Sequence, residues 1–475
     1  MAAVLVAACG GGVDDSDPGV ETTATTETTP TPGDQGDGGE VGDLALAEEC
    51  PVGALDDRDD ADGPVEIDFW YGLPGHIEAI DALVDAYNRS QDRVVVTAQL
   101  RGTPDETLDQ YLISLRSGNR PAMVQLEFLA LQLGADSGSF IPVQACIDAA
   151  GYDLDDYIER AIAAFSIDGV LWPMPFNIAN QVLYANRLQL DAAGVTELPT
   201  TLAEVRAAAE AIVDTGAAMS GLALTSSPWL IEQLFALDGA DYADGANGRD
   251  RRATELLIDD ELGVEIFEWL HEMVADGLAV FVGDGANLEQ YLSLAVGRAA
   301  MVMDTSAALR GVLDAADALP GVEIAVGPLP SVGERSGAVA VSGAGLWLDA
   351  DTTDIERAAV WDFMVYATSP QVQARWHADT GYVPVRSSSV GLDEVMMLWE
   401  TEPEFRVAYD QLVDGVESSA TAGLVIGNHA QIRAEAVAPA LESMYLRSVE
   451  LRVALRDAKA AADAIIADYN RRTGN

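Results

Sequence analysis

Apolar residues at the start of the folded part of the chain follow a pattern of alternating strands and helices. Val65, Ile67 and Phe69 occupy every second position and predict a strand, whereas the apolar residues within 77–87 recur at helical spacing. Strands that alternate with helices form a mainly parallel sheet with helices on both faces, so an α/β unit is predicted. The alternation continues with a strand at 94–100, a helix near 105–116 and a strand near 123–128.

The middle of the chain is mainly helical before strands return. A helix is expected to begin at Thr201, because Glu204 stands three residues later in the pattern of a capping box. A chain that leaves an α/β unit and comes back to it forms two lobes, and ligands commonly bind in the cleft between them. The returning elements are strands at 299–303, 322–326 and 338–348, a helix that begins at Thr353, and a largely helical last hundred residues.

A helix followed by a rigid corner is predicted near the C-terminal end. Pro370 suits the first helical position, and Gly381 suits the stop of a helix that runs to Thr380. Pro384 prevents the helix from resuming, so Tyr382 is held at the corner. By itself this pattern leaves two alternatives for Tyr382, a side chain that fills core space or a ligand contact.

Composition restricts the classes of partner. The 475 residues include 78 acidic and 26 basic side chains, a formal net charge of -52 that opposes binding to nucleic acid or to an anionic membrane. Lys459 is the single lysine, so arginine must supply any strong anion contact. The four histidines are scattered and no nucleophile, nucleotide or metal motif stands out. The sequence therefore predicts neither an enzyme, nor a metal site, nor a cofactor.

The N-terminal region and the cysteines suggest an exported protein. Cys9 follows a short apolar run with small residues, which resembles the lipobox of a bacterial lipoprotein, so 1–9 is predicted to be a lipoprotein signal with Cys9 as the lipidated residue. Residues 10–63 are predicted to be a disordered acidic tether. Cys50 and Cys146 are then either a disulfide or two buried free thiols. No later run is long and apolar enough to span a membrane.

Short motifs from residue 64 to the C-terminus carry a family resemblance. The chain resembles the extracellular solute-binding proteins (family 1) of bacterial ABC importers, and within them it is most similar to the sn-glycerol-3-phosphate and glycerophosphodiester binders. The motifs are Phe69-Trp70 with Gly75, 117–122, 175–177 with 183–186, 297–301, 343–347, 376–384 and 427–433. The 376–384 and 427–433 motifs together are the most specific for this group.

The resemblance implies an architecture and a set of partners. The expected fold is α/β, a two-lobe periplasmic-binding-protein fold of class II, maltose-binding-protein-like, with the ligand cleft between the lobes. The expected partners are a small phosphorylated polyol or sugar and the transmembrane permease subunits, for a monomer held at the cell membrane by lipid alone. The implied ranges are 64–178 plus 306–368 for lobe 1 and 179–305 plus 369–475 for lobe 2.

Site residues carry over from the family one by one. Phe128 stands where the family has a glutamate, and strand alternation would point the neighbouring Glu127 to the opposite face. Ligand tyrosine and serine positions of the family are likewise changed, to Pro104 and Ala179. The implied ligand contacts present in this sequence are Thr305, Gly343, Tyr382 and Arg433, and the candidate aromatic contacts are Trp229 and Trp70.

The retained contacts are those expected on the phosphate side of a ligand. The guanidinium of Arg433 can bind two phosphate oxygens at once, although a surface pair with Glu435 or Glu442 is the alternative. The implied function is capture of glycerol 3-phosphate or a glycerophosphodiester outside the cytoplasm for delivery to the permease. The lost contacts at Pro104, Phe128 and Ala179 motivate the alternative, a sugar- or oligosaccharide-binding protein of the same superfamily.

Overall fold

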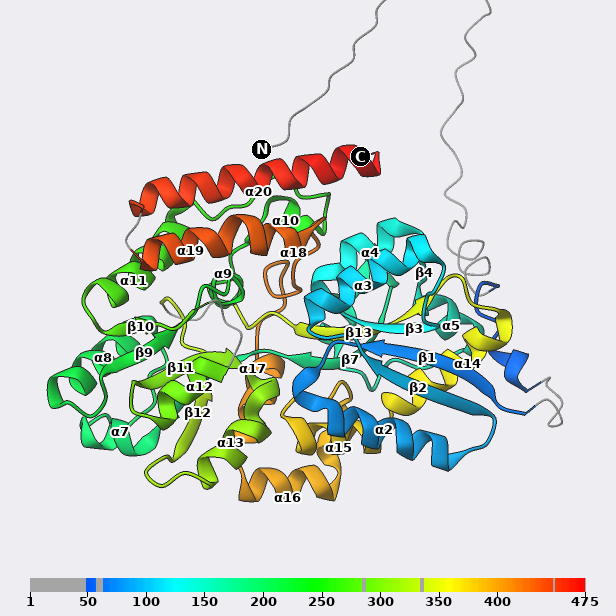
Figure 1. Ribbon diagram of the computed structural model, residues 1–475, viewed down its shortest axis with the longest axis horizontal. Helices are drawn as coiled ribbons and strands as arrows, with labels where there is room; N and C mark the ends of the chain where they lie inside the picture. Colours follow the sequence, from blue (N-terminus) through cyan, green and yellow to red (C-terminus); the bar gives the residue numbers. More distant parts are fainter. Residues whose placement is uncertain (1–47, 57–62, 284–287, 334–336, 447–448, 475) are drawn as a thin grey trace, which may run out of the picture.

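Two lobes, each built on its own sheet, stand side by side (Figure 1). The computed structural model describes residues 48–56, 63–283, 288–333, 337–446 and 449–474. The predicted signal 1–9 with Cys9 and most of the predicted tether lie outside these residues. Both lobes are mixed α/β, and the two-lobe fold expected from the resemblance is confirmed.

The sheet of the first lobe has the strand order β2-β1-β3-β13-β4, with β7 also paired to β13. Its first three strands are parallel, and β13 runs antiparallel to β3, β4 and β7. The alternation of Ile67 and Phe69 puts both side chains in the core, at 2% and 0% exposure. The strands are β1 (Val65–Tyr71), β2 (Val94–Leu100), β3 (Met123–Glu127), β4 (Phe140–Ile141), β7 (Met174–Ala179) and β13 (Ser342–Asp349).

Helices cover the first sheet. Its helices α3 and α14 begin with capping boxes, in which Thr103 pairs with Glu106 and Thr353 with Glu356. The helices of this lobe are α2 (Ile77–Ser90), α3 (Pro104–Ser117), α4 (Leu131–Ser137), α5 (Val143–Ala150), α6 (Glu159–Ala164) and α14 (Asp354–Ala367).

The sheet of the second lobe has the strand order β10-β9-β11-β8-β12. The predicted capping box of Thr201 with Glu204 is confirmed at the start of its helix α8. The strands are β8 (Gln181–Asn186), β9 (Ser220–Leu224), β10 (Ala279–Phe281), β11 (Ala299–Thr305) and β12 (Ile324–Pro328). The helices are α7 (Arg187–Ala192), α8 (Leu202–Thr215), α9 (Trp229–Leu237), α10 (Asp244–Gly248), α11 (Glu261–Ala275), α12 (Leu288–Ala295), α13 (Leu309–Asp317), α17 (Glu404–Val413), α18 (His429–Ile432), α19 (Ala438–Tyr445) and α20 (Leu451–Thr473).

One predicted lobe boundary differs from the structure. The range 306–368 was expected in lobe 1, but β12 pairs antiparallel with β8 and therefore belongs to the second sheet. After β12 the chain returns to the first sheet at β13. The periodicity of a strand does not reveal which sheet the strand joins, because pairing is decided by a distant segment. The lobes are thus linked at the β7–β8 junction, between β12 and β13, and after α14.

The helix and corner predicted near the C-terminal end are confirmed. Helix α15 runs over Pro370–Thr380, and Gly381 ends it with φ of 107°, which favours glycine. Ser369 takes the N-cap position, but its hydroxyl donates to the Tyr366 carbonyl instead of accepting a capping bond. Helix α16 (Asp393–Thr401) follows the corner, below the junction of the lobes in Figure 1.

The last part of the predicted tether is packed against the first lobe. Cys50 is fully buried and forms a disulfide with Cys146 of α5, so the alternative of two free thiols does not hold. A 3-10 turn follows at Val52–Leu55, and Leu55 joins the core. Residues 48–56 therefore do not behave as the tether that their polar composition suggested, because a covalent link and a buried leucine fix them. Within the described residues no helix has the length and apolarity needed to cross a bilayer.

Removal of this disulfide is expected to destabilise the protein without changing ligand binding. The bridge closes a sequence separation of 96 residues, and closing a loop of this length stabilises a fold by roughly 2–5 kcal/mol. The double variant Cys50→Ala and Cys146→Ala should show that loss in urea unfolding. A reductant should lower the stability of the unaltered protein but not of the variant, and equal sensitivity of both proteins would contradict the prediction.

Candidate functional site

The ring of Tyr382 is fixed between two other rings beside the junction of the lobes. It stacks on Trp376, with ring centroids 5.7 Å apart, and meets the edge of His76 at 5.4 Å. Only 6% of Tyr382 is exposed. The local chain explains this position, since the Gly381 turn directs the residue back under α15.

His377 fixes the backbone of the same corner. Its Nδ1 donates to the Tyr382 carbonyl at 2.7 Å, because its Nε2 accepts from the Trp399 indole at 2.9 Å. Burial lowers the pKa of His377 to about 4, although the bond to the Tyr382 carbonyl opposes this shift. The imidazole is therefore neutral at physiological pH and acts as a structural brace.

A chain of buried amides leads to the Tyr382 hydroxyl. The Gly72 amide donates to Gln125 Oε1 at 3.0 Å, and Gln125 Nε2 donates to Asn177 Oδ1 at 2.8 Å. The Asn177 side chain in turn hydrogen-bonds Tyr382 and favours its ionised form, as a donor does, while burial raises the pKa of the phenol above its ordinary value. The phenol therefore stays protonated, and its hydrogen is free to be donated to another group.

Thr305 lies at the end of β11, against the Tyr382 corner. A Cβ added at Gly381 would come within 2.4 Å of the Ser306 carbonyl, so the two segments touch. The Thr305 hydroxyl accepts from the Ala307 amide at 3.1 Å as an N-cap, which leaves its own hydrogen available. The chain segments that carry Thr305 and Tyr382 are thus in contact next to both residues.

The requirement for glycine at Gly343 comes from a neighbouring strand. Its φ is 100°, and a Cβ there would lie 2.1 Å from the Asn177 carbonyl of β7. The glycine was expected to allow close approach to the backbone, and the approaching group is this carbonyl. Gly343 is thereby held beside Asn177 and Tyr382.

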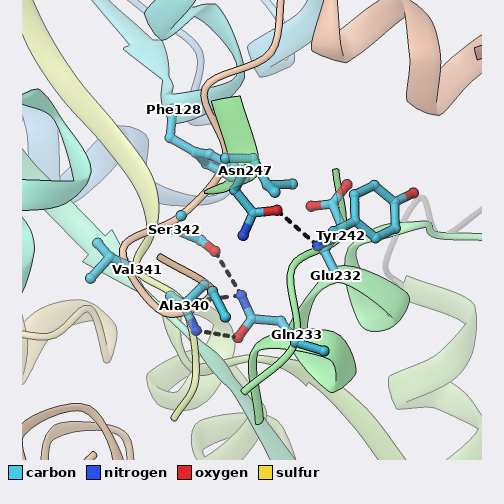
Figure 2. Close-up of a pocket in the computed structure, with 12 residues that line it drawn as sticks. Phe128, Glu232, Gln233, Tyr242, Asn247, Ala340, Val341 and Ser342 are labelled. Atoms are coloured by element: carbon cyan, nitrogen blue, oxygen red, sulfur yellow. Dashed lines mark hydrogen bonds between the residues drawn. The ribbon is translucent and has the colours of Figure 1, made fainter. Parts of the chain in front are cut away.

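Trp229 opens α9 at the junction of the lobes. Its half-buried indole donates to the Ser342 hydroxyl at 2.8 Å, and Gln233 Nε2 lies 3.2 Å from the same oxygen. Figure 2 shows Gln233 reaching both Ser342 and Ala340 across a small pocket. The pocket is lined from both lobes, by Phe128, Glu232, Gln233, Ala240, Tyr242, Asn247, Ala340, Val341, Ser342, Ala420, Gly423 and Leu424.

Arg433 forms a buried ion pair with Glu232. This glutamate lies in α9, about one helical turn after Trp229. The Nε of Arg433 donates to Glu232 Oε1 at 2.8 Å and its Nη2 donates to Oε2. His429, four residues before Arg433, adds a bond from Nε2 to Oε1 at 2.9 Å. The alternative interpretation of Arg433, a surface ion pair with Glu435 or Glu442, does not hold, because its partner is the buried Glu232.

The helix around Arg433 is irregular for a local reason. A π-helical turn, labelled η7 (Arg433–Val437), separates α18 from α19. Pro439 follows within the first turn of α19 and cannot donate to the carbonyl four residues earlier, which favours a wider turn. The arginine thus projects from an interrupted helix, whereas the histidine lies in the regular turn before it.

In the buried cluster of Glu232, His429 and Arg433, the negative charge of the glutamate balances the positive charge of the arginine. Burial would raise the pKa of Glu232, but Arg433 and His429 outweigh burial and lower it to about 2. Burial lowers the pKa of His429, and its Nδ1 has no partner among the described residues. His429 is therefore neutral and donates from Nε2. The bonds to Glu232 use Nε and Nη2 of Arg433, and the arginine side chain is 16% exposed.

Phe128 faces this cluster, and the charge of the neighbouring Glu127 acts on it. Strand β3 ends at Glu127 and a 3-10 turn begins at Phe128, so strand alternation no longer separates the two side chains. The Phe128 ring lies 5.2 Å from the Arg433 guanidinium. Burial raises the pKa of Glu127 to about 7 although Arg433 opposes the shift, and the Glu127 charge is also felt by Tyr382. The charge of Glu127 therefore acts on both Arg433 and Tyr382.

Trp70 lies apart from these residues. Its indole is 5% exposed in a second core cluster with Tyr111 and Val124, and the Arg101 guanidinium covers its ring at 3.6 Å. As β1 alternates, Trp70 points to the sheet face opposite Phe69 and Tyr71. A packed indole under an arginine has no face left for a ligand, so its position does not support the predicted contact.

Five of the six predicted contacts are joined by short interactions. Tyr382 touches the Thr305 segment and Asn177, and Asn177 touches Gly343. The same chain of contacts reaches Arg433 through Ser342, Trp229 and α9. Of the changed family positions, Pro104 begins α3 and Ala179 is buried at the end of β7.

The sequence interpretation missed Glu232, His429, Asn177 and Gln125. The spacing of His429 and Arg433 by four residues was the available signal, since it places both on one helical face where they can share a partner. Nothing in the sequence identified that partner, which is 201 residues away.

Comparison with known proteins agrees with this architecture. The family described as bacterial extracellular solute-binding protein matches residues 82–406. The sn-glycerol-3-phosphate-binding periplasmic protein UgpB of Rhizobium meliloti (strain 1021) is 26% identical over 416 residues, which cover 86% of this chain and 95% of the relative. UgpB of Yersinia pestis bv. Antiqua (strain Antiqua) is 26% identical over 86% of this chain and 93% of its own length.

Solved structures share the fold. UgpB from Mycobacterium tuberculosis in complex with glycerophosphocholine has a TM-score of 0.73 at 21% identity, covering 86% of this chain and 99% of the other. The GacH receptor of Streptomyces glaucescens GLA.O has a TM-score of 0.71 at 20% identity, with the same coverage. These relatives are substrate-binding proteins and not enzymes. The chain belongs to the bacterial extracellular solute-binding proteins and is a binding protein of an ABC importer, of the UgpB type.

Proposed function

We propose that the protein captures a small phosphorylated polyol, glycerol 3-phosphate or a glycerophosphodiester, and delivers it to its permease. The observation that carries the proposal is the placement of Arg433, whose guanidinium is held by Glu232 through Nε and Nη2 while the side chain stays 16% exposed. A guanidinium fixed on one edge loses little conformational entropy when its other edge binds a phosphate oxygen. The Tyr382 and Thr305 hydroxyls supply further donors.

Delivery follows from closure of the lobes around the ligand. Residues of the site come from both lobes, because Gln125 and Asn177 lie in strands of the first sheet, whereas Thr305 ends β11 and Trp229 opens α9 of the second lobe. A ligand that touches both lobes binds the closed state more tightly than the open state and shifts the population toward it. The monomeric closed form then docks on the permease. Lipidation at Cys9, which lies outside the described residues, would keep the protein at the membrane surface.

Calorimetric titration tests the ligand class. Glycerol 3-phosphate, glycerophosphocholine and maltose should be titrated into the purified protein under one buffer condition. Heat with at least one of the two phosphate compounds and none with maltose is the expected result. Absence of heat with both phosphate compounds would overturn the proposal.

A neutral sugar is the second candidate, and one observation favours it. Glu232 already balances the charge of Arg433, so the cluster does not require an anion. Sugar-binding proteins also share the fold, including the sugar-binding protein MalE from Xanthomonas citri, with a TM-score of 0.70. Heat with maltose and none with the phosphate compounds would select this function.

A further inference from the structure

Glu232 is placed to set the charge of the ligand that the site accepts. Its side chain is 4% exposed, and both carboxylate oxygens accept hydrogen bonds from Arg433. His429 adds a bond to Oε1. The carboxylate is thus fully occupied by groups of this chain, and it remains ionised because it is the counter-charge of Arg433.

The charge of the whole cluster follows from its members. Arg433 carries +1 and Glu232 carries -1, while His429 is neutral because burial lowers its pKa. Glu127 adds negative charge whenever it is ionised, since it interacts electrostatically with Arg433, Glu232 and Asp105. Among the described groups that act on this cluster, there is therefore no net positive charge available to a ligand.

A phosphate monoester and a phosphate diester place different demands on such a cluster. A monoester carries between one and a half and two negative charges at neutral pH, since its second pKa is about 6. A diester carries a single negative charge at any physiological pH. One part-exposed guanidinium can match a single charge, whereas the second charge of a monoester would be repelled by Glu232 and Glu127 in a poorly solvated place.

We propose that Glu232 is a specificity-determining residue that makes the site prefer a singly charged phosphodiester over a doubly charged phosphomonoester. This inference rests on the proposed function. Glu232 acts through Arg433 and through its own charge, and it does not need to touch the ligand. The surrounding -52 formal charge of the chain acts in the same direction, because it opposes the approach of a dianion more than that of a monoanion.

The test compares glycerol 3-phosphate with its methyl ester, which differs by one methyl group and one charge. At pH 7.5 and fixed salt, the unaltered protein should bind the methyl ester at least about tenfold more tightly. A tenfold ratio corresponds to an electrostatic interaction that shifts a pKa by about one unit. Equal affinities, or tighter binding of glycerol 3-phosphate, would overturn the inference while leaving the proposed function intact. Binding of neither compound would overturn the inference, and it would overturn the proposed function as well if glycerophosphocholine also failed to bind.

The variant Glu232→Gln separates a role in charge from a role in structure. If Glu232 sets ligand charge, the ratio of the two affinities should fall by about tenfold in the variant. If Glu232 only holds Arg433 in place, both ligands should weaken by the same factor and the ratio should not move, which would overturn the inference. Glu435→Gln is the matched control, because it removes an exposed carboxylate from the same helical segment and should leave the ratio unchanged.

Discussion

Replacement of Arg433 by methionine is expected to abolish phosphate binding and to lower the free energy of unfolding by about 3–5 kcal/mol. The large effect on stability arises because Glu232 would remain buried, at 4% exposure, with only His429 as a donor. The expected loss of ligand affinity is up to about 100-fold, since a charged hydrogen bond to phosphate contributes about 1.5–3 kcal/mol. Urea unfolding and calorimetric titration measure the two effects.

Two further variants separate these effects. Arg406→Met breaks an exposed pair with Asp410, at 58% and 41% exposure, and should cost no more than about 0.5 kcal/mol. The double variant Arg433→Met with Glu232→Met removes the whole buried pair, so stability should recover while phosphate binding stays lost. Recovery of phosphate binding in the double variant would show that Arg433 is only structural.

The loss of stability caused by Arg433→Met should become smaller at low pH. The pKa of Glu232 is lowered from 4.5 to about 2, so the stability it contributes is present above about pH 4.5 and is lost as the pH falls toward 2. The stability difference between the unaltered protein and Arg433→Met should therefore narrow over that interval. A difference that stays constant down to pH 2 would contradict the assignment of Glu232 as the partner that determines the effect.

Local sequence signals predicted the parts of this structure that depend on neighbouring residues. The capping box at Thr201 and the α15 helix with its Gly381 stop are set within one or two turns of chain, and both are confirmed. The assignment of β12 to the first lobe was wrong, because the sequence pattern of a strand does not show which strand it pairs with. Pairing is decided by the side chains and edges available elsewhere in the fold.

In the candidate site, too, the sequence pointed to some residues but not to their distant partners. Family motifs led to Tyr382 and Arg433, yet the residues that orient them are remote in sequence: Asn177 for the phenol and Glu232 for the guanidinium. Trp70 is predicted as a ligand contact, but an aromatic residue in a strand does not reveal which face of the sheet it occupies, and here it packs in the second core cluster. Knowledge of the contacts in space was needed for these residues, and no spacing along the chain could replace it.

Gly343→Ala is expected to destabilise the protein by about 3 kcal/mol or more. A backbone with φ of 100° costs an L-residue roughly 1–3 kcal/mol, and the added methyl group would lie 2.1 Å from the Asn177 carbonyl, which forces β7 and β13 apart. Because Asn177 also holds the Tyr382 phenol, ligand affinity should fall together with stability.

The control for this substitution is Gly311→Ala. Gly311 lies in α13 with nothing within 4 Å of an added Cβ, so alanine there should be neutral or stabilise the protein by up to about 1 kcal/mol. Urea unfolding of the two variants measures the difference. If Gly343→Ala kept full stability and lost only ligand binding, then the glycine would serve the ligand directly, and the close approach of the Asn177 carbonyl would not be the reason for glycine at this position.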